Sequence, residues 1–314
     1  MMGSGRGSTC WSTCWAAGVV ALALAVGCSG DNKQNLVLGL IRPSLDHLPY
    51  QLAKLADDPD LAGIEIRYFT SGWETSEALA SGRLDAAILP FTYAWTAVSR
   101  GLPVRIVSFL ERESDGIVAR RNIAKVEDLD GKRIGVLRAS TIEILAVMAL
   151  DDRGLSAELV PLRGPAEMVA ALRAGDVDAL SFYVPPILTL GEQFHVVHWY
   201  GEDHPGHPCC DLVVYAPAAR KKEAALSRLR EALAAATAQV ETADWQAHAA
   251  AAAVDLYNLP PHVADAALTR LRFGLGREAS GRAFQLRAAS VMRDLGYLDV
   301  IPDTNDVYLP LARR

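Results

Sequence analysis

One twelve-residue pattern occurs twice in this chain and limits what the chain can fold into. Residues 78–89 read ALASGRLDAAIL and residues 171–182 read ALRAGDVDALSF, so Ala-Leu-x-x-Gly-x-[Leu/Val]-Asp-Ala recurs. Each copy predicts the end of a helix, a left-handed turn at Gly82 or Gly175, and a strand buried on both faces. Each predicted strand ends at a proline-marked loop.

A second similarity extends the repeat towards the N-terminus. LIRPS at 40–44 matches VLRAS at 136–140, and each closes an apolar run that precedes a helical pattern. The chain therefore contains two β-α-β-α-β units of similar plan. Two copies with so long a period do not make a solenoid, so we expect two lobes that face each other.

The alternation of apolar runs and helical patterns predicts an α/β fold. We expect each lobe to be a mostly parallel sheet flanked by helices. The first lobe is discontinuous, with residues 35–112 and 213–314, and the second covers 113–212. From Pro217 onward the pattern is almost entirely helical, with breaks at Gly274 and Gly276.

The N-terminus has the pattern of a processing signal. An apolar stretch from Trp15 to Val26 precedes Gly27 and Cys28, as in a bacterial lipoprotein. We expect a signal peptide at 1–27, a lipid on Cys28 and a polar tether at 28–34. An uncleaved anchor is the alternative, but about 12 apolar residues are few for a bilayer.

Charge and cysteine content exclude some functions. A net charge of −6 and a pI near 5.7 argue against nucleic-acid binding. After removal of the signal, only Cys209 and Cys210 remain beside Cys28, so there is no disulfide framework. Adjacent thiols do not easily occupy two tetrahedral positions, and we expect two packed or semi-exposed thiols and no metal site.

Ligand-binding residues are expected beyond the carboxyl ends of the strands, where helix N-termini present free amides. This rule selects residues from both lobes. They are Arg42, Ser44, His47, Ser71, Gly72, Phe91, Thr92, Arg138, Ser140, Thr141 and Tyr183.

Several of these side chains also have a purely structural interpretation. Ser140 and Thr141 either cap the following helix or offer hydroxyls to an anion, and Tyr183 is either a ligand contact or a hinge aromatic. Arg42 and Arg138 favour an anionic ligand. The sequence has no Gly-x-Ser-x-Gly, Walker loop, Gly-x-Gly-x-x-Gly or His-Glu-x-x-His motif. These absences argue against an enzyme without excluding one, and we expect no catalytic residues and no cofactor.

A family resemblance rests on a series of segments in fixed order. They are GWETSEALASGRLDAAIL, RGLPVRIV, KVEDLDGKRIGVLRAST and EMVAALRAGDVDAL, followed by a helical C-terminus. The series resembles the substrate-binding proteins of ABC importers, in the branch for nitrate, sulfonate, taurine and the thiamine-precursor pyrimidine. The similarity covers roughly residues 36–300. At 181–186 the chain reads SFYVPP, where many relatives have Trp, an acidic residue and Pro, which leaves the ligand class open.

The resemblance implies a type II periplasmic-binding fold that closes on a small anionic or polar solute, such as an oxoanion or a sulfonate. It also implies partnership with a membrane permease and its ATPase, and a lipid-anchored monomer on the outer side of a bacterial membrane. A thiamine-precursor pyrimidine is the alternative solute. Two alternatives from other classes are a pyrimidine-synthase-like enzyme and a sensor coupled to a receptor.

Overall fold

The computed structural model describes residues 35–239 and 242–310. Cys28 and the expected signal peptide lie outside these residues. Within the described ranges, none of the helices has the length and apolar character needed to cross a membrane.

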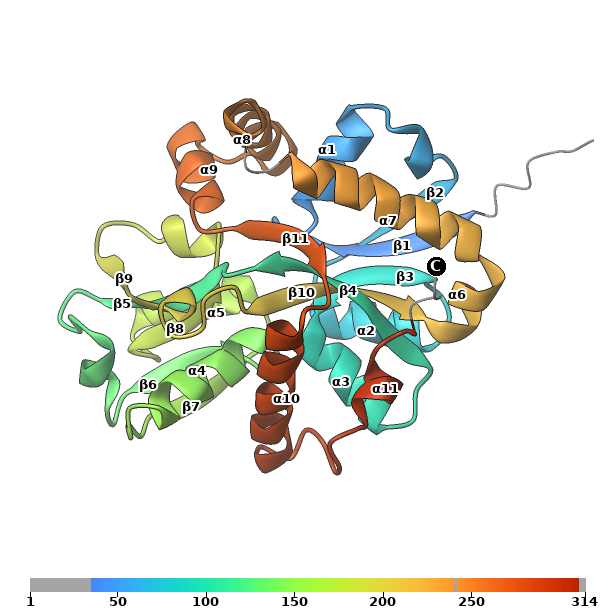
Figure 1. The fold of residues 1–314 in the computed structure, drawn as a ribbon. Coiled ribbons are helices and arrows are strands. Elements are labelled where there is room, and N and C mark those ends of the chain that lie inside the picture. The colour runs from blue at the N-terminus through green and yellow to red at the C-terminus, as the bar shows by residue number, and fades with distance from the viewer. Residues whose placement is uncertain (1–34, 240–241, 311–314) are drawn as a thin grey trace, which may run out of the picture. The chain divides into compact units, whose positions relative to one another are not determined.

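Two β-sheets, each flanked by helices, form the fold (Figure 1). The first sheet has the order β11-β4-β10-β3-β1-β2 and the second has the order β7-β6-β8-β5-β9. The strands of the first sheet are β1 (Leu36–Ile41), β2 (Ile64–Phe69), β3 (Ala86–Pro90), β4 (Val104–Arg112), β10 (Pro208–Tyr215) and β11 (Arg272–Gly276). Those of the second are β5 (Asp115–Arg120), β6 (Arg133–Leu137), β7 (Glu158–Leu162), β8 (Ala179–Tyr183) and β9 (Phe194–Trp199). We call each sheet with the helices packed on it a lobe.

Among the described helices, three lie between strands of the first sheet, two lie between strands of the second sheet, and six follow β10. They are α1 (Leu48–Leu55), α2 (Gly72–Ala80), α3 (Phe91–Ser99), α4 (Thr141–Asp151), α5 (Pro165–Ala174), α6 (Ala216–Lys221), α7 (Glu223–Ala238), α8 (Ala243–Tyr257), α9 (Pro261–Leu268), α10 (Ala279–Asp294) and α11 (Thr304–Val307). Short 3₁₀ turns occur at Pro59–Leu61, Val126–Leu129, Pro186–Leu188 and Tyr200–Glu202.

The two sheets are mixed rather than mostly parallel. β1 pairs in parallel with β2 and β3, and β6 does so with β7 and β8. The strands that carry the chain between the lobes run antiparallel to their neighbours: β4 and β10 in the first sheet, β5 in the second. The two-lobed α/β fold is confirmed, with this correction to the strand directions.

Only Glu113 and Ser114 separate β4 from β5, so the chain passes directly from one sheet to the other. β4 continues to Arg112, so the polar residues Glu111 and Arg112 are part of it. The return strand β10 begins at Pro208, within the range 113–212 expected for the second lobe, yet all of it belongs to the first sheet. The polar residues at this crossing therefore lie within or beside paired strands.

The expectation that the chain is almost entirely helical after Pro217 was wrong at one element. β11 runs through both glycines expected to be breaks and pairs antiparallel with β4. A sequence as short and glycine-rich as RFGLG has little strand preference of its own. Its pairing with β4 is a tertiary contact, which local sequence does not reveal.

The doubled pattern has the same structural role in both lobes. Gly82 (φ 75°) and Gly175 (φ 88°) follow α2 and α5 in left-handed conformation. The Asp85 carboxylate accepts a 2.7 Å hydrogen bond from the Val37 backbone N–H, and Asp178 accepts one of 2.9 Å from that of Arg133. Each repeat thus fixes the start of the neighbouring parallel strand, β1 or β6.

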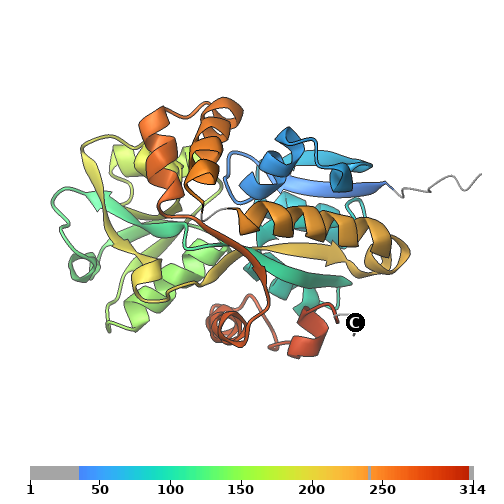
Figure 2. The ribbon, with the colours of Figure 1, turned by 45° about the horizontal axis from the view of Figure 1, so that its top comes forward.

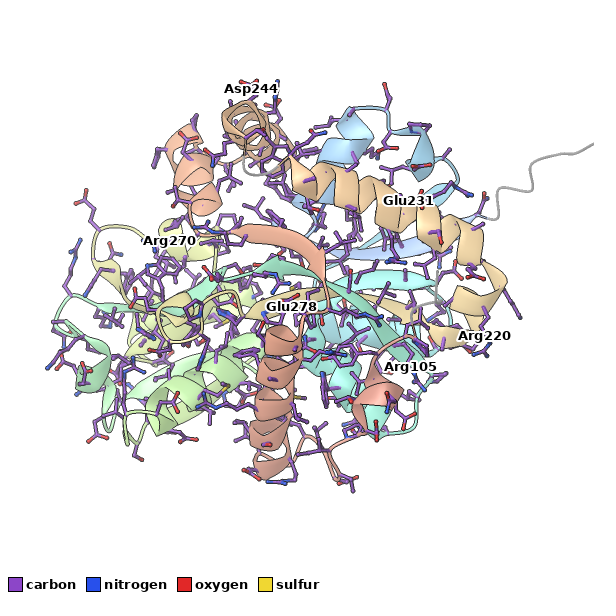
Figure 3. All side chains as sticks on the ribbon, viewed as in Figure 1. Arg105, Arg220, Glu231, Asp244, Arg270 and Glu278 are labelled. Carbon is purple, nitrogen blue, oxygen red and sulfur yellow. The ribbon has the colours of Figure 1, made fainter. Side chains whose placement is uncertain are left out.

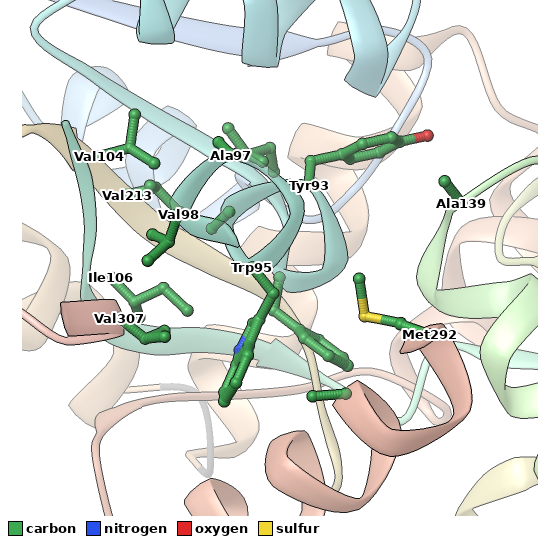
Figure 4. Packing of buried hydrophobic residues seen from close by; sticks show 14 of the residues in the cluster. Tyr93, Trp95, Ala97, Val98, Val104, Ile106, Ala139, Val213, Met292 and Val307 are labelled. Atoms are coloured by element: carbon green, nitrogen blue, oxygen red, sulfur yellow. The ribbon is translucent and has the colours of Figure 1, made fainter. Parts of the chain in front are cut away.

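Helices from the C-terminal half connect the two lobes. One apolar cluster joins α3, α10 and the loop between β6 and α4. Tyr93 and Trp95 of α3, Ala139 of the loop and Met292 of α10 belong to it (Figure 4). In both ribbon views α7 lies along the first sheet, while α8 and α9 stand together beyond its end (Figure 2). The α9 residue Ala264 packs in the apolar cluster of the second sheet.

Candidate functional site

A cavity of about 1130 Å³ lies between the lobes. Both lobes supply its lining residues from loops that follow strands and from the first turns of helices, as the strand-end rule predicts. Seven of the expected ligand-binding residues line it. They are Ser44, Ser71, Gly72, Arg138, Ser140, Thr141 and Tyr183.

The N-terminus of α4 places two hydroxyl residues at the cavity. The Ser140 hydroxyl accepts a hydrogen bond from the Glu143 backbone N–H (3.4 Å) and donates one to the Leu137 carbonyl (2.5 Å). The Thr141 hydroxyl donates a 3.4 Å hydrogen bond to the Cys209 carbonyl of β10, across the lobes. Ser140 therefore caps the helix, and Thr141 links α4 to the first sheet.

Four expected residues do not line the cavity. Phe91 and Thr92 have no exposed surface, because they belong to the first turn of a helix that is buried on nearly all sides. The Phe91 ring packs edge-on against Phe284 of α10, with 6.1 Å between ring centroids. Tyr93 in the same turn and Thr96 one turn further along α3 reach the cavity instead.

The other two are held by aromatic neighbours. The buried His47 ring contacts the Asp46 carboxylate through Nδ1 (2.6 Å) and the Tyr257 hydroxyl through Nε2 (2.9 Å). The Arg42 guanidinium lies 3.6 Å from the centroid of the Tyr68 ring. His47 is therefore bound on both ring nitrogens, and Arg42 is exposed but lies outside the cavity lining.

The positive charges that line the cavity already have neighbours. Arg163 forms an ion pair with Glu167, at 3.3 Å between Nε and the carboxylate. The guanidinium carbons of Arg138 and Arg100 lie 5.7 Å and 6.0 Å from the ring centroids of Tyr297 and Trp73.

Buried acids are the feature that the sequence analysis missed. Glu111, Asp115 and Asp46 all line the cavity, and each is at most 4% exposed. Burial, and next the nearby Asp115 carboxyl, raises the pKa of Glu111 well above its usual range. Burial also raises the pKa of Asp115 to about 6. The available signal was the pair Glu111 and Asp115 in the polar segment between two apolar runs.

The thiols of Cys209 and Cys210 lie beside these acids. Both residues are buried, both line the cavity, and their sulfur atoms are 4.0 Å apart. The structure therefore contains two buried free thiols, in agreement with the expectation of packed thiols at this pair. Their position at the wall of the cavity was not foreseen.

Comparison with known proteins places the chain in a family. Residues 29–255 match the family model of the NMT1-like family. The chain belongs to the NMT1-like family. A segment of 134 residues is 32% identical to the taurine-binding periplasmic protein of Escherichia coli, and it covers 41% of this chain and 42% of that protein. This match spans less than half the length of either protein.

Solved structures share the fold over nearly the whole chain. The periplasmic aliphatic sulphonate binding protein SsuA of Escherichia coli has a TM-score of 0.74 at 21% identity, over 87% of this chain and 97% of SsuA. The ligand-binding component of an ABC-type import system from Staphylococcus aureus, solved with zinc bound, has a TM-score of 0.76 at 17% identity. The latter match covers 88% of this chain and 97% of that one. The fold is that of periplasmic binding proteins.

Proposed function

We propose that this protein is an extracytoplasmic solute-binding protein, which captures a small polar solute between its lobes and delivers it to an ABC importer. The observation that carries the proposal is the 1130 Å³ cavity, lined by polar residues of both lobes. A ligand that touches both lobes stabilises their closed arrangement. The relatives named for taurine and aliphatic sulphonate support a small organic solute.

The expected anionic solute has weaker support than the cavity itself. Arg42 stacks on Tyr68 and does not line the cavity, whereas Arg138 does. The N-terminus of α4, with Ser140 and Thr141, remains the best place for an anionic group, because free amides at a helix start attract negative charge. We therefore place the polar head of the solute there.

A thermal-shift screen tests this proposal. The purified protein is heated with taurine, alkanesulfonates, nitrate, bicarbonate or aminopyrimidines, and a ligand that binds the native state raises the melting temperature. Solute titration by calorimetry then measures the affinity. Chemical conversion of the bound solute would contradict a binding role and favour an enzyme.

Variants of α4 test where the solute binds. Replacing both Ser140 and Thr141 by Ala should weaken solute binding at least about tenfold, since each lost hydrogen bond to a charged group is worth about 1.5–3 kcal/mol. The control is Thr242→Ala, which removes the hydroxyl cap of α8, a helix start outside the cavity lining. If both proteins bind equally, the solute does not contact the N-terminus of α4.

The anchor on Cys28 is part of the same proposal. A Cys28→Ser variant cannot receive the lipid, and we expect it to leave the membrane fraction for the soluble fraction of the cell envelope. Membrane retention of this variant would show that another segment provides the anchor.

A further inference from the structure

Three groups that bind metals lie together at one wall of the cavity. They are the Glu111 carboxylate at the end of β4 and the thiols of Cys209 and Cys210 at the start of β10. One ligand atom from each lies within 4.8 Å of the others, and all three residues are buried. All three also line the cavity, so an ion has a path from solvent to this cluster.

Irregular pairing of β10 explains why two adjacent thiols lie together. Neighbouring residues of a regular strand point to opposite faces, which would hold the two thiols apart. The register between β10 and β4 shifts on both sides of Cys210, which pairs with Glu111. Such bulges break the alternation of side chains and re-aim them.

The spacing of the sulfur atoms suits a shared ion. Zinc binds thiolates at about 2.3 Å in tetrahedral geometry, which places two coordinating sulfurs about 3.8 Å apart. The Cys209 and Cys210 sulfurs are 4.0 Å apart. A small adjustment of side-chain torsions would bring both into the coordination sphere of one ion.

Glu111 lacks the partner that a buried carboxylate requires. Neither of its carboxyl oxygens has a well-formed hydrogen bond among the described residues, although the residue is only 1% exposed. Only the Ser114 hydroxyl and the Cys209 thiol lie near enough to favour its ionised form. The next residue, Arg112, points elsewhere: its guanidinium pairs with Glu278 at 2.7 Å and donates to the Gly206 carbonyl at 2.8 Å (Figure 3 labels Glu278). Burial therefore disfavours the ionised form of Glu111, and a positive partner such as a metal ion would stabilise it.

The groups around this cluster are also acidic. Asp115 receives a hydrogen bond from Ser114 at one oxygen, while its other oxygen has no partner in the described structure. The Asp46 carboxyl lies near enough to raise the pKa of Glu111 further. The local chemistry is therefore that of a cation site, with two soft sulfur donors and one hard oxygen donor.

We propose that Glu111, Cys209 and Cys210 form a site for a soft divalent metal ion such as Zn²⁺. Thiolates prefer zinc over magnesium or calcium, which bind through oxygen alone. Three protein ligands leave a fourth position, which Asp115, water or the captured solute can occupy. On binding, each thiol loses its proton to solvent and the sulfur becomes a ligand.

This inference is independent of solute capture. Zinc bound at the cluster can be measured without any solute, and solutes can be screened in the presence of a chelator. Binding of a solute without binding of zinc would contradict only the metal site. Binding of zinc without binding of any solute would contradict only the proposed function.

The test is zinc binding by the purified, chelator-treated protein. After incubation with Zn²⁺ and gel filtration, elemental analysis should find one zinc per chain. Competition with a chromophoric chelator gives the affinity, which should fall at least about tenfold in Cys209→Ser, Cys210→Ser and Glu111→Gln. The matched control is Glu167→Gln, which removes a cavity carboxylate that lies outside the cluster and pairs with Arg163.

A second measurement guards against variants that fold poorly. In the unaltered protein, Co²⁺ in place of Zn²⁺ should produce thiolate-to-cobalt charge-transfer absorption, which zinc then displaces. The proposal is overturned if no zinc is retained, if zinc is retained equally by the two cysteine variants, or if cobalt shows no thiolate band. An organic amine that raises the melting temperature, in the absence of zinc binding, would overturn it too and assign the buried acids to an ammonium group.

Discussion

The Tyr297 hydroxyl donates a 2.9 Å hydrogen bond to the Glu143 carboxylate. Tyr297 follows α10, which packs on α3 and β10 of the first lobe, whereas Glu143 lies in the first turn of α4 in the second. Both helices contact each other as well. The bond therefore joins the lobes directly beside Ser140 and Thr141, at the wall of the cavity.

A Tyr297→Phe variant should lose this link. We expect the free energy of unfolding to fall by about 1 kcal/mol, which is typical for one hydrogen bond. Amide exchange should also become faster at residues 139–143, because the Glu143 carboxylate also accepts from the Ala139 N–H. Urea denaturation and hydrogen exchange measure the two effects.

Tyr215→Phe is the matched control for this substitution. Within the described structure the Tyr215 hydroxyl forms no hydrogen bond, and its ring packs beside Gly82. If both variants lose the same free energy of unfolding, the loss comes from removing a tyrosine hydroxyl, and the interlobe hydrogen bond contributes no stability of its own.

The two repeat aspartates should differ in their contribution to stability. Asp85 accepts from a backbone N–H and also pairs with Lys222 at 2.6 Å, with side chains 13% and 28% exposed. Asp178 has the same backbone bond, but its pair with Arg133 is longer, at 3.8 Å, and more exposed. Exposed ion pairs contribute little.

We therefore expect Asp85→Asn to lower the free energy of unfolding by about 1–2 kcal/mol, and Asp178→Asn by less than about 1 kcal/mol. Urea denaturation of both variants measures this difference. A larger loss for Asp178→Asn would contradict the assignment of the extra stability to the Lys222 ion pair.

Much of the fold follows from local signals in the sequence. The repeats predicted both glycine turns and both strands. The expected loop after the first copy is absent, because β3 ends at Pro90 and α3 begins at Phe91. β11 could not be predicted, because its only clear support is pairing with β4. The antiparallel direction of β10 likewise depends on where a distant segment returns.

The candidate site was predicted in part. The strand-end rule found the hydroxyl residues of α4 and the Ser71–Gly72 turn, because that rule depends only on the end of a strand. It also selected His47, which does not line the cavity and contacts Tyr257, 210 positions away. It could not find Glu111, since only the register shifts of β10 bring both cysteines towards its carboxylate.

A glycine of the repeat gives a third prediction. Gly175 ends α5 at φ 88°, and a Cβ there would meet the Arg120 guanidinium at 3.4 Å. Gly175→Ala should lower the free energy of unfolding by about 1–2 kcal/mol, because an L-residue resists the left-handed conformation. The control is Gly274→Ala, where φ is not positive and no atom lies within 4 Å of the new Cβ. Thermal melts of both variants should show a loss only for Gly175→Ala, and a loss of the same size at Gly274 would rule out conformational strain.

Asp203 should control part of the stability in acid. Its carboxylate receives two 2.8 Å hydrogen bonds from the Arg153 guanidinium and contacts His198 Nε2 at 2.8 Å. The hydrogen bonds from Arg153 lower the pKa of Asp203 below its usual value. The unfolded chain, with an ordinary carboxyl pKa of about 3.9, then binds the proton more readily than the folded one. The stability from this pair is present at neutral pH and is lost as the pH falls through the lowered folded-state pKa.

Asp203→Asn should therefore cost about 2 kcal/mol at pH 7, as expected for a charge-assisted bidentate pair. The difference from the unaltered protein should shrink as the pH is lowered from about 5 towards 3. Urea denaturation across this range measures it, with Asp294→Asn as the control, because the Arg293 pair there is largely exposed and should show no such trend. A difference that keeps its full size at pH 3 would show that the Asp203 contribution does not depend on its charge, and that packing of the Tyr200–Glu202 turn is responsible instead.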